Sequence, residues 1–274
     1  MFRDNAVASD TSEPGTSANT TRRGTPAHSL DHSAVLGARR GFEGLIINRG
    51  RARERSLRPY SAASPSALAA ERIAKLKALQ VGIAESLDQI EAANRLIDQR
   101  YAWRGYSVEA FDYGTQYARV EESRHEITFF AAEPQTTLGT ITLRLDGPDG
   151  LSAEATHGDT MQNARADGRR LGELTRLAVA EGVESRVVLA SLFGLVYAVG
   201  RMVHGVTDVF IEVNPRHVAF YSRALGFAVA GEERFCERVR APSVLLHLDV
   251  EVLDEQLGFK NLQAADEPLM QYGT

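Results

Sequence analysis

Apolar and polar positions change their period several times between residues 171 and 227, and each period predicts one element. Alternate residues share one face of a predicted strand, namely Leu171, Glu173, Thr175, Leu177 and Val179. Residues 187–203 are apolar nearly all round, which is typical of a helix buried against a sheet. Residues 209–213 alternate as a second strand. This order predicts a right-handed crossover between two neighbouring parallel strands.

Local signals place the remaining elements. Asn214 followed by Pro215 predicts the start of a helix, since Asn is a favoured N-cap and Pro a favoured first residue. Ser86 and Gln89 form a capping box that starts a helix at residues 87–101, after a strand at 78–84. Further predicted elements are an antiparallel hairpin (residues 127–131 and 137–145) and a polar helix (residues 153–166).

One stretch fits two structures. Leu76, Ile83, Ile90 and Ile97 are seven residues apart, a spacing that also fits a long helix or a coiled coil. However, apolar residues alternate around Gly82, which favours the strand followed by a helix.

Charge and composition divide the chain into three parts. Residues 1–65, rich in Ser, Thr, Gly, Pro and Arg, predict a disordered tail. Residues 66–250 form the predicted domain, opening with a short helix at 67–77, and residues 251–274 form a C-terminal tail with a short helix at 252–257. Up to Ser66 the chain has ten Arg and six acidic residues, a net charge of +4. The rest has 21 basic and 30 acidic residues, a net charge of −9. An acidic domain disfavours a nucleic-acid partner.

Composition, the single cysteine, hydropathy and histidine spacing disfavour several classes of function. The 274 residues contain 43% hydrophobic and 24% charged side chains, ordinary values for a soluble globular protein. A single cysteine, Cys236, excludes an internal disulfide and fits a reducing cytosol, so we expect a cytoplasmic protein. No signal peptide is evident, and the apolar block at residues 187–200 is expected to be too short to span a bilayer. The histidines show no metal-ligand spacing, so no metal is expected.

Three stretches together resemble a known family. They read GRRLGELTRLAV, VFIEVNPRHVAFYSRALGF and APSVLLHLDV. Their order resembles the core of the GNAT acyltransferases. Their amino-acid sequences are more similar to those of the bacterial N-acyl-amino-acid synthases, which are related to the acyl-homoserine-lactone synthases. The resemblance covers roughly residues 79–250. It implies an α/β fold with a GNAT-like mixed central sheet flanked by helices, and the polar insert at 153–166 favours the synthase branch.

Amide formation from a thioester needs a base that removes a proton from the attacking amine. Glu173 is the predicted base, because a carboxylate on an interior strand has its pKa raised by burial. The alternative is a structural ion pair with Arg169, Arg170 or Arg176. The resemblance favours the catalytic role. Glu212 is the second candidate.

The resemblance implies further roles along the same core. Backbone amides at Ala178, Val179 and Ala180, where the Glu173 strand leaves its neighbour, are expected to hold the oxyanion. Tyr221 is expected to protonate the leaving thiolate, although its helical spacing also fits simple packing. Asn214 is expected to cap its helix and to contact the pantetheine arm of the donor.

The stretch AEGVESRV at residues 180–187 decides which donor we expect. It lacks the paired glycines that hold the pyrophosphate of CoA in GNAT enzymes, whereas Ser185 and Arg186 could hold a single phosphate at a helix N-terminus. This favours phosphopantetheine on an acyl carrier protein over acyl-CoA. Arg169 and Arg170, together with Arg186, are the predicted docking residues for the carrier.

The predicted reaction moves a long-chain fatty acyl group from acyl carrier protein to the α-amine of an amino acid. Trp103, Arg144, Arg176 and Glu212 are the predicted acceptor-binding residues; Trp103, like Tyr106 and Phe111, also fits packing at the edge of the core. No bound cofactor is expected, and a homo-oligomer is compatible with the sequence. The alternatives are an acyl-CoA-dependent N-acetyltransferase and a non-catalytic GNAT-like domain that binds lipids or partners.

Overall fold

The computed structural model describes residues 32–54, 79–106 and 125–257. An eight-stranded sheet forms its centre. The strands are β1 (Gln80–Ile83), β2 (Glu126–Glu133), β3 (Thr136–Leu145), β4 (Leu171–Val179), β5 (Asp208–Val213), β6 (Ala228–Val229), β7 (Arg234–Cys236) and β8 (Ala241–Asp249). Their order is β1-β2-β3-β4-β5-β8-β6, and β7 pairs with β8. Only β4 and β5 are parallel neighbours among these strands, which confirms the predicted crossover.

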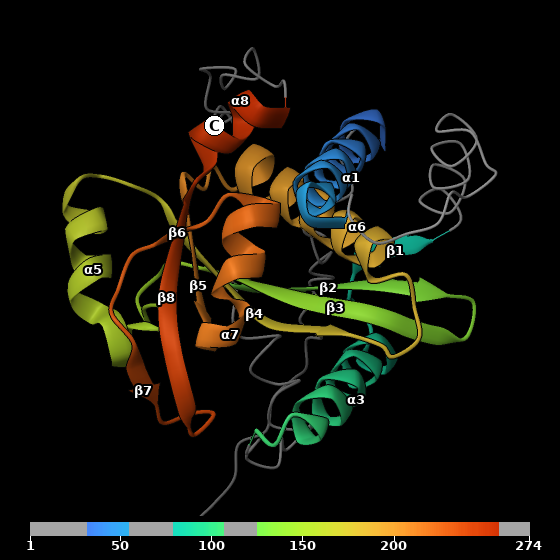
Figure 1. Cartoon of the computed structure of the whole chain (residues 1–274), viewed down its shortest axis with the longest axis horizontal. Coiled ribbons are helices and arrows are strands. Elements are labelled where there is room, and N and C mark those ends of the chain that lie inside the picture. Colours follow the sequence, from blue (N-terminus) through green and yellow to red (C-terminus); the bar gives the residue numbers. More distant parts are fainter. Residues whose placement is uncertain (1–31, 55–78, 107–124, 258–274) are drawn as a thin grey trace, which may run out of the picture.

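Helices cover both faces of this sheet (Figure 1). They are α1 (His32–Glu54), α3 (Leu87–Trp103), α5 (Glu154–Ala166), α6 (Ser185–Tyr197), α7 (Pro215–Phe220) and α8 (Val250–Leu257). Helices α1 and α6 lie on one face, and α3 lies on the other. Two helices continue as π-helical segments, α6 into Ala198–Val203 and α7 into Tyr221–Leu225.

Local sequence signals account for several boundaries. The side chain of Ser86 accepts a hydrogen bond from the Gln89 amide, and Gln89 bonds back, so the predicted capping box starts α3. Because β1 ends at Ile83 before this box, the coiled-coil alternative is wrong over the described residues. The hairpin of β2 and β3 is also confirmed, with its turn at Pro134 and Gln135.

The main core lies between the sheet and the pair α1 and α6. Every residue of α6 from Val187 to Tyr197 is buried. With its π-helical continuation, Ser185–Val203 is long and apolar enough to cross a membrane by length and composition, which corrects the expectation that this block is too short. However, 78% of that stretch is buried inside the fold, as in the core helix of a soluble protein.

The N-terminal tail prediction is wrong for residues 32–54. This stretch forms α1, and its Ala38, Phe42 and Ile46 join the main core against α6. Their spacing places them on one face of a helix. Likewise α8 contributes Leu253 to the core, so the domain continues past its predicted end at residue 250. The predicted helix at residues 67–77 and Phe111 lie outside the described residues.

Candidate active site

The predicted site residues converge where β4 and β5 separate. The two strands pair only at Leu171 with Asp208, Gly172 with Val209, and Glu173 with Phe210. Beyond these pairs β4 follows β3, while β5 follows β8. The sheet therefore splits directly after Glu173, as the resemblance implies.

A β-bulge at Arg176 bends β4 as it leaves β5. Thr175 lies opposite Thr142 and Ala178 opposite Thr140, so one residue of β3 faces two of β4. Arg176 has φ of 54°, a left-handed conformation that is uncommon outside glycine. The extra residue reverses the alternation of side chains, and Leu177 and Val179 pack against the main core. The prediction that they share a face with Glu173 is wrong.

The bulge also decides which backbone amides face the split. The Ala180 amide donates to the Leu138 carbonyl oxygen at 2.8 Å, so it is already engaged with β3. Alternate amides of an antiparallel pair point to the same neighbour, so the Ala178 amide also faces β3. Of the three predicted oxyanion donors, only the amide of Val179 is directed toward the gap.

Glu173 is fully buried at the vertex of the split. Its Oε2 accepts a hydrogen bond from the Ser152 amide at 2.5 Å, while its Oε1 is buried and has no hydrogen-bond partner among the described residues. Burial raises the pKa of Glu173, and the positive charge of Arg238 opposes this rise only in part. A buried carboxyl group with one unused oxygen is suited to accepting a proton from a substrate.

The alternative role of Glu173 was an ion pair with a neighbouring arginine. Arg169 instead pairs with Asp208, and also with Asp249 at 3.0 Å, and Arg176 pairs with Glu126 at 3.2 Å. No salt bridge to Glu173 occurs within the described ranges. The structural alternative therefore finds no support.

Glu212, the second candidate base, is fully engaged. Its carboxylate accepts hydrogen bonds from Ser243 Oγ at 2.7 Å and from Arg238 Nη2 at 2.6 Å. Burial alone would raise the pKa of Glu212, but these two donors outweigh it, and the pKa lies below the ordinary value. An ionised, fully bonded carboxylate suits a role in positioning Arg238 better than proton transfer.

Tyr221 begins the π-helical segment after α7, and its side chain is buried. Its ring contacts Phe220 and Phe227, with centroids 5.3 Å and 6.0 Å away. Burial raises the pKa of Tyr221, and nearby Tyr101 raises it further, so the hydroxyl stays protonated at neutral pH. Within the described part of the chain no group hydrogen-bonds this hydroxyl, which leaves its proton available to a substrate.

Sequence reasoning missed two residues of this site. Tyr101, in the last turn of α3, is half-buried and lies close enough to Tyr221 and Arg238 to interact with them electrostatically. Arg238, from the turn between β7 and β8, is 44% exposed at its side chain and acts on both Glu173 and Glu212. No motif marks Arg238, because it reaches the site only through the β7–β8 hairpin.

The predicted donor-binding residues lie around the start of α6 and α7. Ser185 is exposed and Arg186 half-buried at the N-terminus of α6, after a turn in which Gly182 has φ of 75°. Asn214 caps α7: its Oδ1 accepts from the Arg216 amide at 3.3 Å, and its Nδ2 donates to the Pro242 carbonyl oxygen at 3.3 Å. The capping role of Asn214 is confirmed for its Oδ1, while its Nδ2 bonds to β8.

The predicted acceptor-binding residues are not all brought together. Trp103 is 68% exposed, and the guanidinium of Arg100 stacks on its ring at 4.9 Å. Arg144 lies directly opposite Glu173 in the β3–β4 register and pairs with Glu126 at 3.1 Å. Glu126 therefore bridges Arg144 and Arg176 beside Glu173, whereas Trp103 lies at the surface.

Two arginines meet at the open end of the split. Arg104, just after α3, and Arg216, in α7, both approach Nε2 of His217 at 3.3 Å. Arg216 also donates to the Tyr106 hydroxyl at 2.8 Å. Burial, and then these two positive charges, lower the pKa of His217. Neither arginine has a carboxylate partner among the described residues.

Comparison with solved structures finds an N-acyl amino acid synthase and, at lower similarity, an N-acetyltransferase. FeeM, an N-acyl amino acid synthase from uncultured soil microbes, is 27% identical and matches with a TM-score of 0.57, over 65% of this chain and 93% of that one. An N-acetyltransferase from Staphylococcus aureus Mu50 is 14% identical, with a TM-score of 0.44 over 63% of this chain and 97% of that one. A search of curated proteins found no match.

The mixed sheet, split between its two parallel strands beside a buried glutamate, defines an acyltransferase of the GNAT class. The predicted fold class is confirmed. A model of the family "N-acyl amino acid synthase FeeM" matches residues 92–249, more than half of the sequence. The chain belongs to this family of N-acyl amino acid synthases.

Proposed function

We propose that this acyltransferase moves a long-chain fatty acyl group from acyl carrier protein to the α-amine of an amino acid. The observation that carries the proposal is Glu173: its carboxyl group is buried at the split, has a raised pKa and keeps one oxygen free of partners. Family membership supplies the acyl-transfer chemistry.

The geometry supports direct attack on the thioester. The α-amine gives a proton to Glu173 and forms the C–N bond, while the carbonyl oxygen becomes an oxyanion near the Val179 amide. As the tetrahedral intermediate collapses, the C–S bond breaks and the Tyr221 hydroxyl gives its proton to the thiolate. Glu126 orients Arg144 and Arg176, and Glu212 orients Arg238, and the N–H groups of these arginines beside Glu173 suit the carboxylate of the amino acid.

The start of α6 favours a carrier protein over CoA. Glu184 occupies the N-cap without a side-chain capping bond, and Glu181 pairs with Arg100 at 3.2 Å across the turn. Two carboxylates here disfavour a pyrophosphate, whereas Ser185 and Arg186 remain suited to the single phosphate of phosphopantetheine.

The docking residues for the carrier must be revised. Arg169 is neutralised by Asp208 and Asp249, and with Arg170 it lies at the start of β4. The open end of the split is roughly 25 Å away along the strand, at about 3.3 Å per residue. Arg104 and Arg216 stand at that open end, so we assign to them the attraction of the acidic carrier.

The decisive experiment uses the full chain with three donors: acyl carrier protein, CoA and pantetheine, each loaded with the same long-chain acyl group. A mixture of amino acids serves as acceptor, and mass spectrometry identifies N-acyl products. We expect product mainly with the carrier protein. Equal or faster turnover of acyl-CoA would refute the carrier assignment, and no product with any donor would refute the transfer reaction.

Tyr221→Phe is expected to lower kcat by about 10²-fold, at the low end for general acid catalysis, because a thiolate is a good leaving group. Ring packing is preserved, since only the hydroxyl is lost. The measurement is single-turnover acyl transfer with carrier-bound donor. Undiminished turnover would leave Tyr221 with its packing role alone.

The rate is expected to depend on pH through Glu173. Only the ionised carboxylate accepts a proton, and its pKa is raised by burial. Therefore kcat/KM should increase with pH, and the midpoint of this increase should lie above the ordinary glutamate pKa of about 4.3. A pH profile of initial rates checks this. A midpoint at or below the ordinary value would contradict the assignment.

A further inference from the structure

The carbonyl oxygen of the thioester develops negative charge during transfer, and the backbone offers it a single donor. The Ala180 amide bonds to the Leu138 carbonyl oxygen, and the Ala178 amide faces β3 as well. Only the Val179 amide is directed toward the gap. Oxyanion holes commonly combine backbone amides with side-chain donors such as tyrosine. A side chain beside this stretch of β4 is therefore the place for a second donor.

Tyr101 lies beside this stretch, on the face of the sheet that α3 covers. Its side chain packs on an apolar cluster that joins the last turns of α3 to β4, together with Leu96, Ile97, Ala178 and Ala180. Tyr101 follows Ile97 by four residues, so both lie on the same face of α3. The Tyr106 ring meets the Tyr101 ring edge-on, with centroids 5.8 Å apart and planes at 76°. This packing holds Tyr101 next to the stretch that carries the Val179 amide.

Tyr101 and Tyr221 approach the split from opposite faces of the sheet. Tyr221 belongs to the main core on the face of α6, whereas Tyr101 belongs to the cluster on the face of α3. The two phenol groups nevertheless interact electrostatically. They can approach one another because β4 and β5 pair only as far as Glu173 and Phe210. A thioester that enters the gap therefore lies between two hydroxyl groups.

The Tyr101 hydroxyl is available to donate a hydrogen bond. It has no hydrogen-bond partner among the described residues, and the side chain is half-buried, so a substrate in the split can reach it. Burial raises the pKa of Tyr101, and the positive charge of nearby Arg176 opposes this rise only in part. The phenol therefore keeps its proton at neutral pH. Arg238 interacts with Tyr101 as well as with Glu173, so Tyr101 shares its surroundings with the base.

We propose, on the basis of the proposed acyltransferase function, that the Tyr101 hydroxyl is the second hydrogen-bond donor to the carbonyl oxygen of the thioester. Together with the Val179 amide it stabilises the oxyanion, and it keeps its own proton throughout the reaction. Each of the three reacting atoms then has its own group: the amine nitrogen has Glu173, the sulfur has Tyr221 and the carbonyl oxygen has Tyr101.

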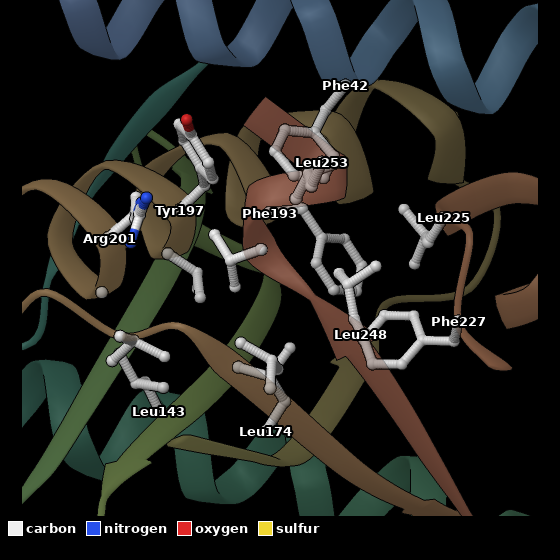
Figure 2. A pocket seen from close by; sticks show the side chains of 15 residues that line it. Phe42, Leu143, Leu174, Phe193, Tyr197, Arg201, Leu225, Phe227, Leu248 and Leu253 are labelled. Atoms are coloured by element: carbon white, nitrogen blue, oxygen red, sulfur yellow. The ribbon is translucent and has the colours of Figure 1, made fainter. Parts of the chain in front are cut away.

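Tyr101→Phe is expected to lower kcat by about 10²- to 10³-fold, the usual effect of removing one oxyanion donor, with little change in KM. The ring and its packing are kept. Tyr197→Phe is the matched control, because it removes a hydroxyl that donates to Asp254 Oδ1 at 2.5 Å. Tyr197 lines a small apolar cavity of the main core with Phe42 and Phe193 (Figure 2), so kcat should be unchanged in this variant.

An activated donor separates the role of Tyr101 from that of Tyr221. In the p-nitrothiophenyl ester of the same acyl group, the thiolate leaves without being protonated, whereas the carbonyl oxygen still becomes an oxyanion. Tyr221→Phe should then match the unaltered protein, while Tyr101→Phe should keep its loss of about 10²- to 10³-fold. If Tyr101→Phe recovers with this donor and Tyr221→Phe does not, the roles are exchanged and the assignment is wrong.

Infrared difference spectra of bound acyl pantetheine, isotope-labelled at its carbonyl carbon, give a readout that needs no transfer. A hydrogen bond to the carbonyl oxygen lowers its stretching frequency, so the band should move to higher frequency in Tyr101→Phe and stay in place in Tyr197→Phe. If no protein forms an N-acyl product but the band moves in Tyr101→Phe, the proposed function is wrong and the assignment of Tyr101 stands. An unmoved band in Tyr101→Phe refutes the assignment, whether or not the enzyme transfers acyl groups.

Discussion

Glu173→Gln is expected to lower kcat/KM by about 10²- to 10⁴-fold, the range that a positioned general base contributes. The amide keeps the shape of the side chain and can still accept the bond from the Ser152 amide, but it cannot take a proton from the amine. The increase of rate with pH, which depends on ionisation of Glu173, should also disappear in this variant. Initial rates with saturating carrier-bound donor, measured across pH, check both effects.

The stability of Glu173→Gln distinguishes a loss of catalysis from a loss of fold. Because the pKa of Glu173 is raised, the native state favours the protonated form, and stability decreases as pH rises through that raised value. An uncharged glutamine avoids this loss, so the variant should unfold at a temperature no lower than that of the unaltered protein at neutral pH. A stable variant with unchanged kcat/KM would exclude Glu173 as the base.

Glu212→Gln is the matched comparison, since it makes the same change on the adjacent strand. This substitution weakens the bonds from Ser243 and Arg238 to a buried carboxylate, so it should lower the melting temperature. The pH profile should keep its rising part, because Glu212 is not the base. If the profile is lost here and kept in Glu173→Gln, the two roles are reversed.

Elements with local signals could be predicted from the sequence. The Ser86 and Gln89 capping box, the β2–β3 hairpin and the Asn214–Pro215 start of α7 each depend on residues a few positions apart. Glu173 could be predicted as well, because strand alternation combined with the family resemblance placed it at the centre of the sheet.

The remaining features depend on contacts between distant residues. Arg238 reaches Glu173 and Glu212 only after β7 and β8 have paired, and the bulge at Arg176 depends on the register with β3. Helix α1 is different, because Ala38, Phe42 and Ile46 already recur at helical spacing. The Gly and Arg residues around them make this pattern hard to recognise in the sequence. Helix α1 becomes part of the core only through its contact with the apolar α6.

Gly194→Ala is expected to destabilise the protein by about 1–3 kcal/mol, the usual cost of overpacking a core. Gly194 lies in α6 where α1 crosses, and an added Cβ would lie 2.6 Å from Arg39 Cα and 2.7 Å from Arg39 N. These are backbone atoms, so α1 itself must move away. The better helix propensity of alanine, about 1 kcal/mol, offsets only part of this cost.

Gly44→Ala is the control for this change, because it makes the same substitution in α1 where no atom lies within 4 Å of the new Cβ. It should stabilise the protein by up to about 1 kcal/mol through helix propensity alone. Thermal unfolding and hydrogen exchange of the α1 amides measure the two variants together. Faster exchange across α1 is expected only in Gly194→Ala, since that methyl group separates α1 from α6. Equal stability of both variants would show that α1 does not pack on α6 at Gly194.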